Sequence, residues 1–397
     1  MFNENKQGWK VLISAAILQI FLGVIYIWSI FVLPVTETLS WTEDAAKLTA
    51  SFMIGFFSLA LIYGGKLQVK ICASKVVVIG GLMMVGGMAA AGLTPPAAPW
   101  LLYITYGVIA GFGAGMGYIA SITAAQKWFP KRRGFATGLC VGAFGVSVSI
   151  FAPIIRHFLV VFDNDPRPIF LLLAGTFLVA VLLLGPKVKF PEQTAAAVIG
   201  GDKKQYTTKE ALRTKEFYLI ATSIFLITVA FFVLNPAFQT LSMARGFDAA
   251  FATTLIVITG LSNTLGRVII PVLSSRIGNE KTILVLMVAN AVAAAFLIFA
   301  DGVPFVIMAS LITFCFGASL SVFPLITADY FGIANLGANY GAVMIGFALS
   351  SLVMPGVIGL LGGYTVMFIA VTVLSGIGIL CVISLIAAGR KKNKIAA

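Results

Sequence analysis

Charged side chains are scarce in this chain, and histidine is almost absent. Only 10% of its 397 residues are Asp, Glu, Lys or Arg, and His157 is the one histidine. Hydrophobic residues make up 60% of the chain, whereas soluble domains average about 45–50%. The mean hydropathy is +1.04. This shortage of charge excludes an ordinary soluble domain and indicates a membrane protein.

The chain also lacks the clusters that catalysis or metal binding needs. Its four cysteines have no metal-like spacing, and we expect no disulfide framework among them. The apolar runs contain no grouping of His, Asp, Glu or Cys for acid–base or metal chemistry, so we expect neither an enzyme nor a cofactor. His157 falls at the outer end of an apolar run, where reaching for the interface is the simpler explanation of a polar side chain. A sensor would be expected to carry a soluble signalling domain.

Long apolar runs recur along the whole chain. A run of about twenty apolar residues crosses a hydrocarbon layer of roughly 30 Å as a helix, whereas a barrel strand would alternate apolar and polar residues. The first run has no small-residue cleavage site, and we interpret it as a retained helix. The sequence therefore predicts an all-α membrane protein with twelve transmembrane helices, near residues 9–33, 47–68, 75–94, 99–126, 134–157, 168–187, 216–240, 249–274, 281–300, 303–328, 337–361 and 363–388.

The distribution of the basic residues behind the net charge of +13 indicates the membrane topology. With the amino terminus inside, 22 Lys and Arg residues fall in internal segments and 4 in external ones. Such a bias is what the positive-inside rule asks of short loops. We expect a multi-pass protein of the cytoplasmic (inner) membrane with both termini in the cytoplasm. Its surroundings are the lipid bilayer, and the basic balance requires no nucleic acid.

One long polar interval divides the chain into halves. We predict a six-helix half at 1–187, a cytoplasmic linker at 188–215 and a second six-helix half at 216–397. Thr207 and Glu210 form a capping-box pattern, which predicts a short surface helix from about Thr208 to Lys215. For residues 192–206 a flexible connector is an equal alternative.

The two halves resemble each other in sequence. "TAAQKWFPKRRGFATG" parallels "TADYFGIANLGANYG", which pairs Phe129 with Phe331, and "GKLQVKICASK" parallels "PVLSSRIGNEK", which pairs Leu67 with Leu273. The second pair of loops resembles the loop signature of the major facilitator superfamily, although both acidic positions of that signature are lost. The resemblance implies two pseudo-symmetric six-helix bundles that rock about a site at their interface.

Arg267 lies inside the eighth apolar run, and no acidic residue falls in the interior of any run. All fourteen acids assign to loops or helix ends. A guanidinium presents a planar fork of donors that matches a carboxylate, so a substrate can supply the missing anion. Asn263 precedes Arg267 by one helical turn and shares its face. The alternatives are an arginine satisfied by backbone carbonyls or water, and an asparagine that bridges to a neighbouring helix.

Several motifs together resemble a narrower family, the oxalate/formate antiporters, which are relatives of the monocarboxylate transporters. They are "GMGYIASITAAQKWFPKRRGFATG", "NTLGR", "VFPLITADYFG" and "NLGANYG". The resemblance implies that Arg267 binds the substrate carboxylate, that Asn263 is the polar position before it, and that Tyr118 and Tyr26 are pocket tyrosines. A packing role remains open for each tyrosine.

The departures from the family concern its second cation. Oxalate-transporting members have a lysine where this chain has Phe347, a tryptophan where it has Phe316 and a tyrosine where it has Leu320. One cation with apolar walls suits a substrate with one carboxylate, because a dianion would carry an uncompensated charge into a low-dielectric site.

The resemblance and the single cation together predict a secondary transporter of small monocarboxylates such as formate, acetate, lactate or pyruvate. Anion exchange and entry together with a proton both remain open, since no intramembrane acid or histidine is present to carry a proton. The alternatives are an oxalate or other dicarboxylate/formate antiporter and a cation-coupled carrier of another small solute. We expect the protein to function as a monomer.

Overall fold

The structure is a computed structural model that describes residues 3–191, 204–361 and 363–396. No strand occurs within these residues, and helices account for nearly all of them. By its contacts the chain divides into two compact units. The first contains Met1–Gln205 and Gly332–Ala342, and the second contains Tyr206–Phe331 and Val343–Ala397.

The helices of the first unit alternate with short tight or widened turns. In chain order the elements are α1 (Asn3–Leu22), the 3₁₀ segment η1 (Gly23–Ile27), α2 (Trp28–Thr38), α3 (Glu43–Ile71), α4 (Ala73–Gly92), the π-helical segment η2 (Tyr103–Ala110), α5 (Gly111–Trp128), η3 (Pro130–Arg132), α6 (Arg133–Val161), α7 (Arg167–Leu184) and η4 (Gly185–Lys187).

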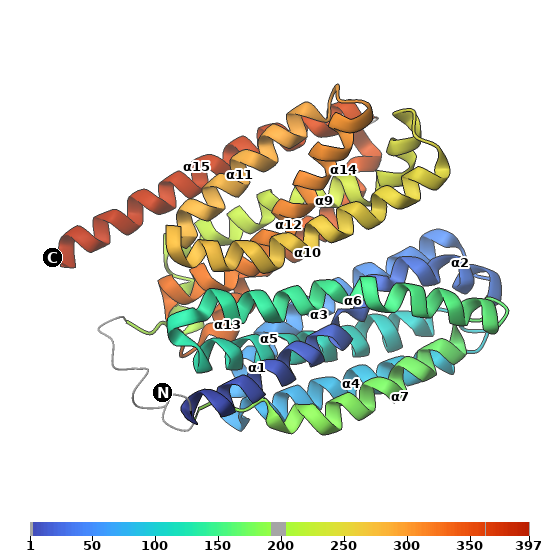
Figure 1. Cartoon of the computed structure of the whole chain (residues 1–397), viewed down its shortest axis with the longest axis horizontal. Coiled ribbons are helices and arrows are strands. Elements are labelled where there is room, and N and C mark those ends of the chain that lie inside the picture. The colour runs from blue at the N-terminus through green and yellow to red at the C-terminus, as the bar shows by residue number, and fades with distance from the viewer. Residues whose placement is uncertain (1–2, 192–203, 362, 397) are drawn as a thin grey trace. The chain divides into compact units, whose positions relative to one another are not determined.

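The remaining helices run from the linker to the end of the chain, and all but most of α13 belong to the second unit. They are α8 (Thr208–Ala211), α9 (Lys215–Ala244), α10 (Ala249–Ile277), α11 (Asn279–Phe296), α12 (Gly302–Phe331), α13 (Leu336–Val343), α14 (Ile345–Leu361) and α15 (Tyr364–Ala396). Figure 1 shows α9, α10, α11, α12 and α15 as long, roughly parallel rods within that unit.

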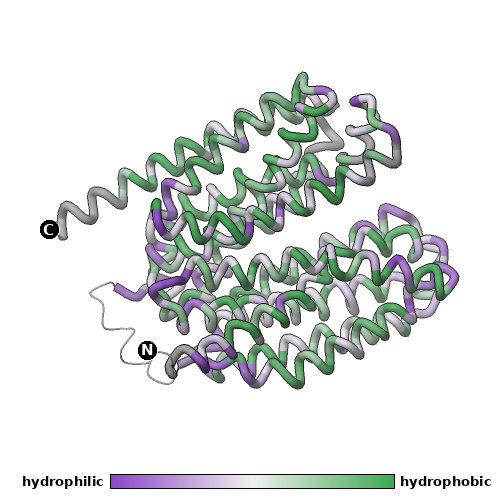
Figure 2. The backbone as a smooth tube through the Cα atoms, viewed as in Figure 1, coloured by the Kyte–Doolittle hydropathy of each residue, from purple (hydrophilic) through white to green (hydrophobic). Residues whose placement is uncertain are grey.

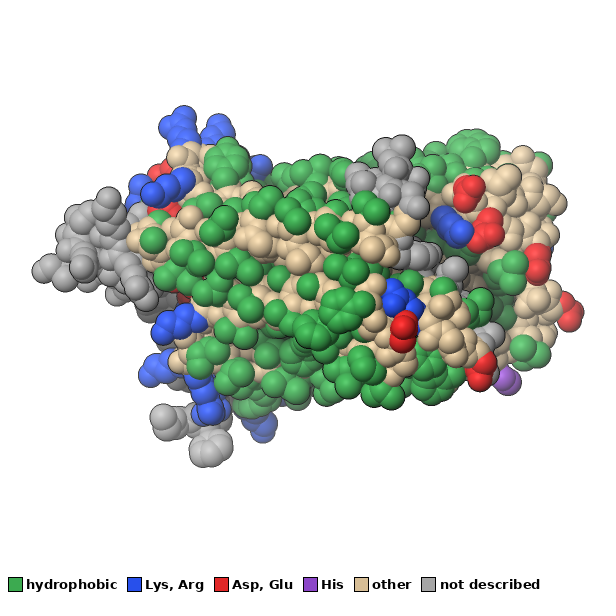
Figure 3. Space-filling view, turned by 90° about the horizontal axis from the view of Figure 1, so that it is seen from above, with side chains coloured by type: hydrophobic (Ala, Val, Ile, Leu, Met, Phe, Trp, Pro, Cys, Tyr) green, Lys and Arg blue, Asp and Glu red, His purple; other side chains and the backbone are tan. Residues whose placement is uncertain are grey.

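Twelve stretches of the described residues are long and apolar enough to cross a membrane, from Lys6–Thr38 to Thr365–Ala388. They coincide with the twelve predicted runs, so this prediction is confirmed. Figure 2 shows apolar residues along the rods and polar residues at the turns between them. In the face shown in Figure 3, hydrophobic side chains cover the middle of the helices and charged side chains lie toward their ends.

The same helix pairs pack together in each unit. In the first unit α3 packs on α5, α4 on α7 and α1 on α6, and in the second unit α10 packs on α12, α11 on α15 and α9 on α14. In both units these are the second span with the fourth, the third with the sixth, and the first with the fifth. The predicted duplication of a six-helix unit is therefore confirmed by packing.

The surface helix before the second unit is shorter than predicted. Its capping box is present, because the Thr207 hydroxyl accepts from the Glu210 amide and the Glu210 carboxylate accepts from the Thr207 amide. The helix ends at Ala211, since the side chain of Thr214 caps the start of the following helix α9. Residues 192–203 of the predicted linker lie outside the described residues.

Candidate functional site

Arg267 occupies the middle of α10 and is almost completely buried, with 2% of its surface exposed. Its Nε donates a hydrogen bond of 2.8 Å to the Oδ1 atom of Asn263. The two residues are four apart and therefore neighbours on one helix face. The structure thus brings together the predicted cation and the predicted amide, and the bond fixes the guanidinium relative to α10.

The neighbouring helix α12 packs closely against α10 beside this pair. A Cβ atom built on Gly317 would lie 2.0 Å from the backbone oxygen of Asn263 and 2.6 Å from its Oδ1 atom. On the α10 side, a Cβ on Gly266 would lie 2.3 Å from the carbonyl oxygen of Phe314. Real Cβ atoms do not approach neighbours so closely. Glycine at these two positions is what allows the two backbones to meet beside Arg267.

Pro271 follows Arg267 by four residues inside α10. Proline has no backbone N–H, so the carbonyl of Arg267 has no helical donor at that position. The hydroxyl of Ser321, which is fully buried on α12, donates to this carbonyl at 3.0 Å. Side-chain hydroxyls from neighbouring helices are a recognised way of satisfying carbonyls freed by proline in membranes.

Four phenylalanines form a cluster in the second unit, which we call the phenyl cluster: Phe231 and Phe232 of α9, Phe316 of α12 and Phe347 of α14. The rings of Phe231 and Phe316 are stacked with centroids 3.7 Å apart. Phe347 lies 5.4 Å from Phe232 and 6.2 Å from Phe316. The predicted wall residues Phe316 and Phe347 are therefore brought together.

The phenyl cluster and Arg267 are linked through α12. Phe316 is adjacent in sequence to Gly317, which contacts Asn263. Leu320, the third predicted wall residue, is 3% exposed and lies one turn after Phe316. One stretch of α12 thus turns Gly317 and Ser321 toward α10 and carries Phe316 against α9, so cation and apolar wall are positioned by the same helix.

In the first unit, the predicted tyrosines gather around Phe144 of α6. The rings of Tyr26 and Tyr118 pack edge-on against Phe144, with centroid distances of 5.3 Å and 4.9 Å. Tyr26 lies in the 3₁₀ segment η1, and Tyr118 lies in α5, where its carbonyl accepts from the side chain of Gln19 at 3.2 Å. Both tyrosines therefore belong to one aromatic group within this unit.

Sequence reasoning missed the partners of these residues. Phe231, Phe232 and Phe144 are ordinary phenylalanines in apolar runs, and only spatial contact distinguishes them. Ser321 carried an indirect signal, because Pro271 announces that the carbonyl of Arg267 requires a donor from elsewhere.

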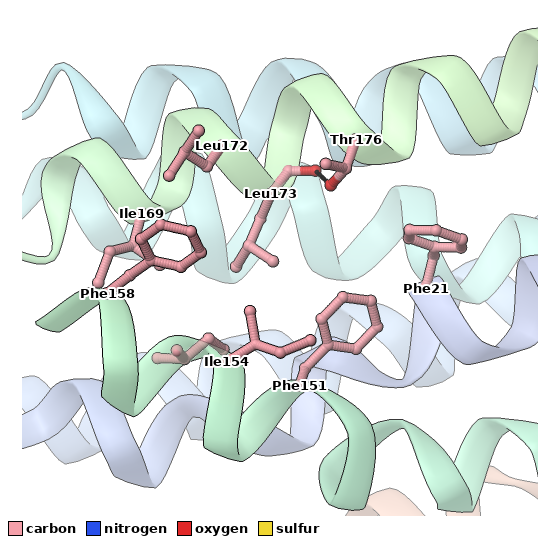
Figure 4. A pocket seen from close by; sticks show the side chains of 9 residues that line it. Phe21, Phe151, Ile154, Phe158, Ile169, Leu172, Leu173 and Thr176 are labelled. Carbon is pink, nitrogen blue, oxygen red and sulfur yellow. Dashed lines mark hydrogen bonds between the residues drawn. The ribbon is translucent and has the colours of Figure 1, made fainter.

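An apolar cavity of about 260 Å³ lies among α1, α6 and α7 of the first unit, with Phe21, Phe151, Ile154 and Leu172 among its lining residues. Figure 4 shows only hydrocarbon side chains around it apart from Thr176, whose hydroxyl donates to the carbonyl of Leu173. A binding site for a small polar solute needs a few convergent polar groups. This cavity does not supply them, so it is no candidate for an anion.

A polar cavity of about 230 Å³ lies at one end of the second unit, where α10, α11 and α12 meet. The hydroxyl of Tyr330 donates to the carboxylate of Glu280, and the amide of Asn279 donates to the carboxylate of Asp329. These acids lie at helix ends, as predicted. Among the described residues no group of His, Cys, Asp and Glu has an arrangement that would hold a metal ion.

Fold and site together define a membrane-embedded helical protein with an internally duplicated bundle and, among the side chains that the structure describes, one deeply buried arginine. The chain belongs to the major facilitator superfamily, because the model of that family matches residues 13–325 and 220–396.

Individual relatives narrow the comparison. The oxalate:formate antiporter of Oxalobacter formigenes is 28% identical, covering 87% of this chain and 82% of that protein. The apicoplast pyruvate carrier 1 of Toxoplasma gondii is 25% identical, covering 92% and 79%. The solved structure of FucP, a superfamily transporter in the outward conformation, has a TM-score of 0.73 at 16% identity and covers 94% of this chain and 98% of its own. The chain is accordingly a transporter of this superfamily and not an enzyme.

Proposed function

We propose that the protein is a secondary active transporter that moves small monocarboxylates, of the formate, acetate, lactate and pyruvate class, across the cytoplasmic membrane by alternating access. The observation that carries the proposal is the burial of Arg267 at 2% exposure beside the neutral amide of Asn263. A charged residue at membrane depth is costly and marks a substrate pathway by default. A carboxylate is the anion whose geometry fits a guanidinium.

The walls near Arg267 support a single carboxylate. Phe316 and Leu320 follow the α12 crossing, and Phe347 packs beside Phe316. None of the three supplies a second positive charge for a dianion. A small apolar or hydroxylated remainder is compatible with such surroundings, and Tyr26 and Tyr118 are proposed as further substrate-binding residues.

Two relatives fit this proposal at the level of their names. One is called an oxalate:formate antiporter and the other a pyruvate carrier, so both are named for small carboxylates. The first makes dicarboxylate exchange the second candidate. In either case, binding of the anion neutralises Arg267, and removal of this desolvated charge eases the rearrangement that opens the site to the other side of the membrane.

The proposed orientation places both termini in the cytoplasm. It rests on the excess of Lys and Arg in alternate loops, with 22 on one side and 4 on the other. We further propose that the protein acts as a monomer, either as an anion exchanger or as a proton-coupled symporter in which the proton accompanies the substrate–arginine pair.

The central test replaces Arg267 with alanine and follows ¹⁴C-labelled formate, acetate, lactate and pyruvate into proteoliposomes. We expect loss of saturable uptake. Arg156→Ala, which removes an exposed arginine near the end of α6, is the control and retains uptake. Undiminished saturable uptake by Arg267→Ala contradicts the proposal.

A thermal-shift screen of the purified protein identifies the substrate. A ligand that binds only the folded state raises the melting temperature. We expect stabilisation by one or more of the four monocarboxylates, and none by the same acids with Arg267→Ala. Stabilisation by oxalate alone favours the dicarboxylate candidate, and uphill uptake driven by an imposed pH gradient distinguishes symport from exchange.

A further inference from the structure

The backbone of Arg267 is held from a neighbouring helix. Pro271 deprives the Arg267 carbonyl of its helical donor, and the Ser321 hydroxyl replaces that donor at 3.0 Å. Ser321 is fully buried, so water does not substitute for it readily. Removing the hydroxyl leaves a buried carbonyl without its donor, which is costly in a membrane interior.

The side chain of Arg267 is held from the same face of α12. Gly317 lies four residues before Ser321, one helical turn away. Its missing Cβ leaves the space that the backbone oxygen and Oδ1 of Asn263 occupy, at 2.0 Å and 2.6 Å from the position of that atom. Asn263 Oδ1 in turn accepts the hydrogen bond from Arg267 Nε. A side chain at Gly317 would therefore displace the acceptor that orients the guanidinium.

We propose that Gly317 and Ser321 are positioning residues for Arg267. Ser321 acts through the hydrogen bond that it donates to the backbone carbonyl of Arg267, to which Pro271 cannot donate, and Gly317 acts through the amide of Asn263. Their effect on transport rests on the proposed function, because it depends on Arg267 binding the substrate carboxylate. Their effect on the geometry of Arg267 does not. When the backbone carbonyl and the Nε atom of Arg267 are both held in place, its planar guanidinium selects a carboxylate by orientation as well as by charge.

The first unit contains a matched control for Gly317. A Cβ atom built on Gly115 of α5 would lie 2.3 Å from the carbonyl oxygen of Phe57 on α3. The backbones approach each other as closely as at Gly317, but the residue opposite is a phenylalanine. Gly115→Ala therefore reproduces the packing penalty of Gly317→Ala without touching the Asn263–Arg267 pair.

A double-mutant cycle tests Ser321. We expect Ser321→Ala to raise the KM for ¹⁴C-pyruvate about tenfold, because loss of this hydrogen bond lets Arg267 shift from the geometry that binds the carboxylate. We expect Ser321→Thr to retain the KM within about twofold, since it keeps the hydroxyl. Pro271→Ala supplies a backbone N–H that donates to the Arg267 carbonyl, so Ser321→Ala in that background has an effect of less than about threefold. Equal effects of Ser321→Ala in the two backgrounds would overturn the role of Ser321.

A spectroscopic test requires no substrate. In protein labelled with ¹⁵N at arginine Nε, the Arg267 resonance is assigned by its absence in Arg267→Lys, and hydrogen bonding to Asn263 protects it from solvent exchange. We expect this resonance to be lost or strongly shifted in Gly317→Ala, Ser321→Ala and Asn263→Ala, and retained in Gly115→Ala and Ser321→Thr. An unchanged resonance in Gly317→Ala and Ser321→Ala would overturn the proposal.

The two tests fail separately. If Arg267→Ala retains uptake while the Arg267 resonance responds to Gly317→Ala and Ser321→Ala, the proposed function is wrong and the positioning role stands. If Arg267→Ala abolishes uptake while Gly317→Ala and Ser321→Ala change neither the Arg267 resonance nor the KM for pyruvate, the positioning role is wrong and the proposed function stands.

Discussion

The crossing of α3 with α5 in the first unit and the crossing of α10 with α12 in the second are two copies of one structure. In the duplicated sequence, Phe57 precedes Leu67 by the same number of residues as Asn263 precedes Leu273. Likewise, Gly115 precedes Phe129 by the same number of residues as Gly317 precedes Phe331. A Cβ atom built on Gly115 would lie 2.3 Å from the backbone oxygen of Phe57, and one built on Gly317 would lie 2.0 Å from the backbone oxygen of Asn263.

The side chains at the two crossings differ in chemistry. In the first unit, Phe57 packs edge-on against Tyr118 at 5.3 Å, and the position that corresponds to Arg267 is the buried Leu61. In the second unit, the same positions hold an amide and a guanidinium joined by a hydrogen bond. The duplicated scaffold preserves the close crossing of backbones, while the ionic chemistry is confined to one copy.

Short of removing Arg267 itself, the largest expected effect comes from changing the shape of the cation at the second crossing without removing its charge. Arg267→Lys replaces a planar fork by a point charge, so bidentate binding of a carboxylate is lost. We expect Vmax/KM for the transported acid to fall about 100-fold, corresponding to roughly 2.7 kcal/mol. Initial rates in proteoliposomes measure it, and a change below threefold would mean that charge alone suffices.

Placing an acidic side chain beside Arg267 at the second crossing is expected to weaken substrate binding. Asn263→Asp places a carboxylate beside Arg267, which gives the guanidinium an anionic partner within the protein. We expect the KM to rise about tenfold or more, because the substrate must displace an internal anion. Asn263→Leu removes the acceptor of Arg267 Nε and adds no charge, so the rise in its KM measures the loss of that hydrogen bond alone. A rise equal to that of Asn263→Asp would contradict the electrostatic explanation.

Adding a second cation tests why the phenyl cluster is apolar. Phe347→Lys introduces an ammonium at a position that is 1% exposed. We expect oxalate to stabilise the variant and to be taken up several-fold faster than by the unmodified protein, whereas uptake of monocarboxylates declines. The melting temperature without ligand falls, because the buried charge is unpaired. Phe347→Leu removes the ring without adding charge, and a gain of oxalate transport there would exclude charge as the cause.

The smallest expected effect lies in the aromatic group of the first unit. Tyr118→Phe keeps the ring contacts with Phe57 and Phe144 and removes one hydroxyl. We expect the KM to rise by about two- to fivefold, as for loss of one neutral hydrogen bond. Tyr106→Phe is the control on the same span, since within the described residues the buried Tyr106 hydroxyl has no hydrogen-bond partner. Identical effects of the two variants would remove Tyr118 from the proposed site.

Much of the fold was accessible from the sequence, and part of the site was too. The twelve spans follow from runs of apolar residues, and the Asn263–Arg267 pair follows from helical periodicity, because both signals are local. The 3₁₀ turn at Gly23–Ile27 and the π-helical turn at Tyr103–Ala110 did not, since no residue pattern required them. Phe316 and Phe347 were predicted as wall residues only. Their packing together with Phe231 and Phe232 required the packing of α9 on α12 and α14.

The sequence by itself determined that this chain is a twelve-span helical membrane protein with a duplicated bundle and one arginine at membrane depth. The length of the apolar runs, the bias of Lys and Arg between loops and the absence of acids from the interior of the runs are properties of composition and residue order. They can therefore be recognised from the sequence alone. Only the tertiary structure decided how that arginine is held. The donor for its carbonyl and the space for its amide partner come from Ser321 and Gly317, more than forty residues away, and a contact between helices has no periodicity that sequence can display.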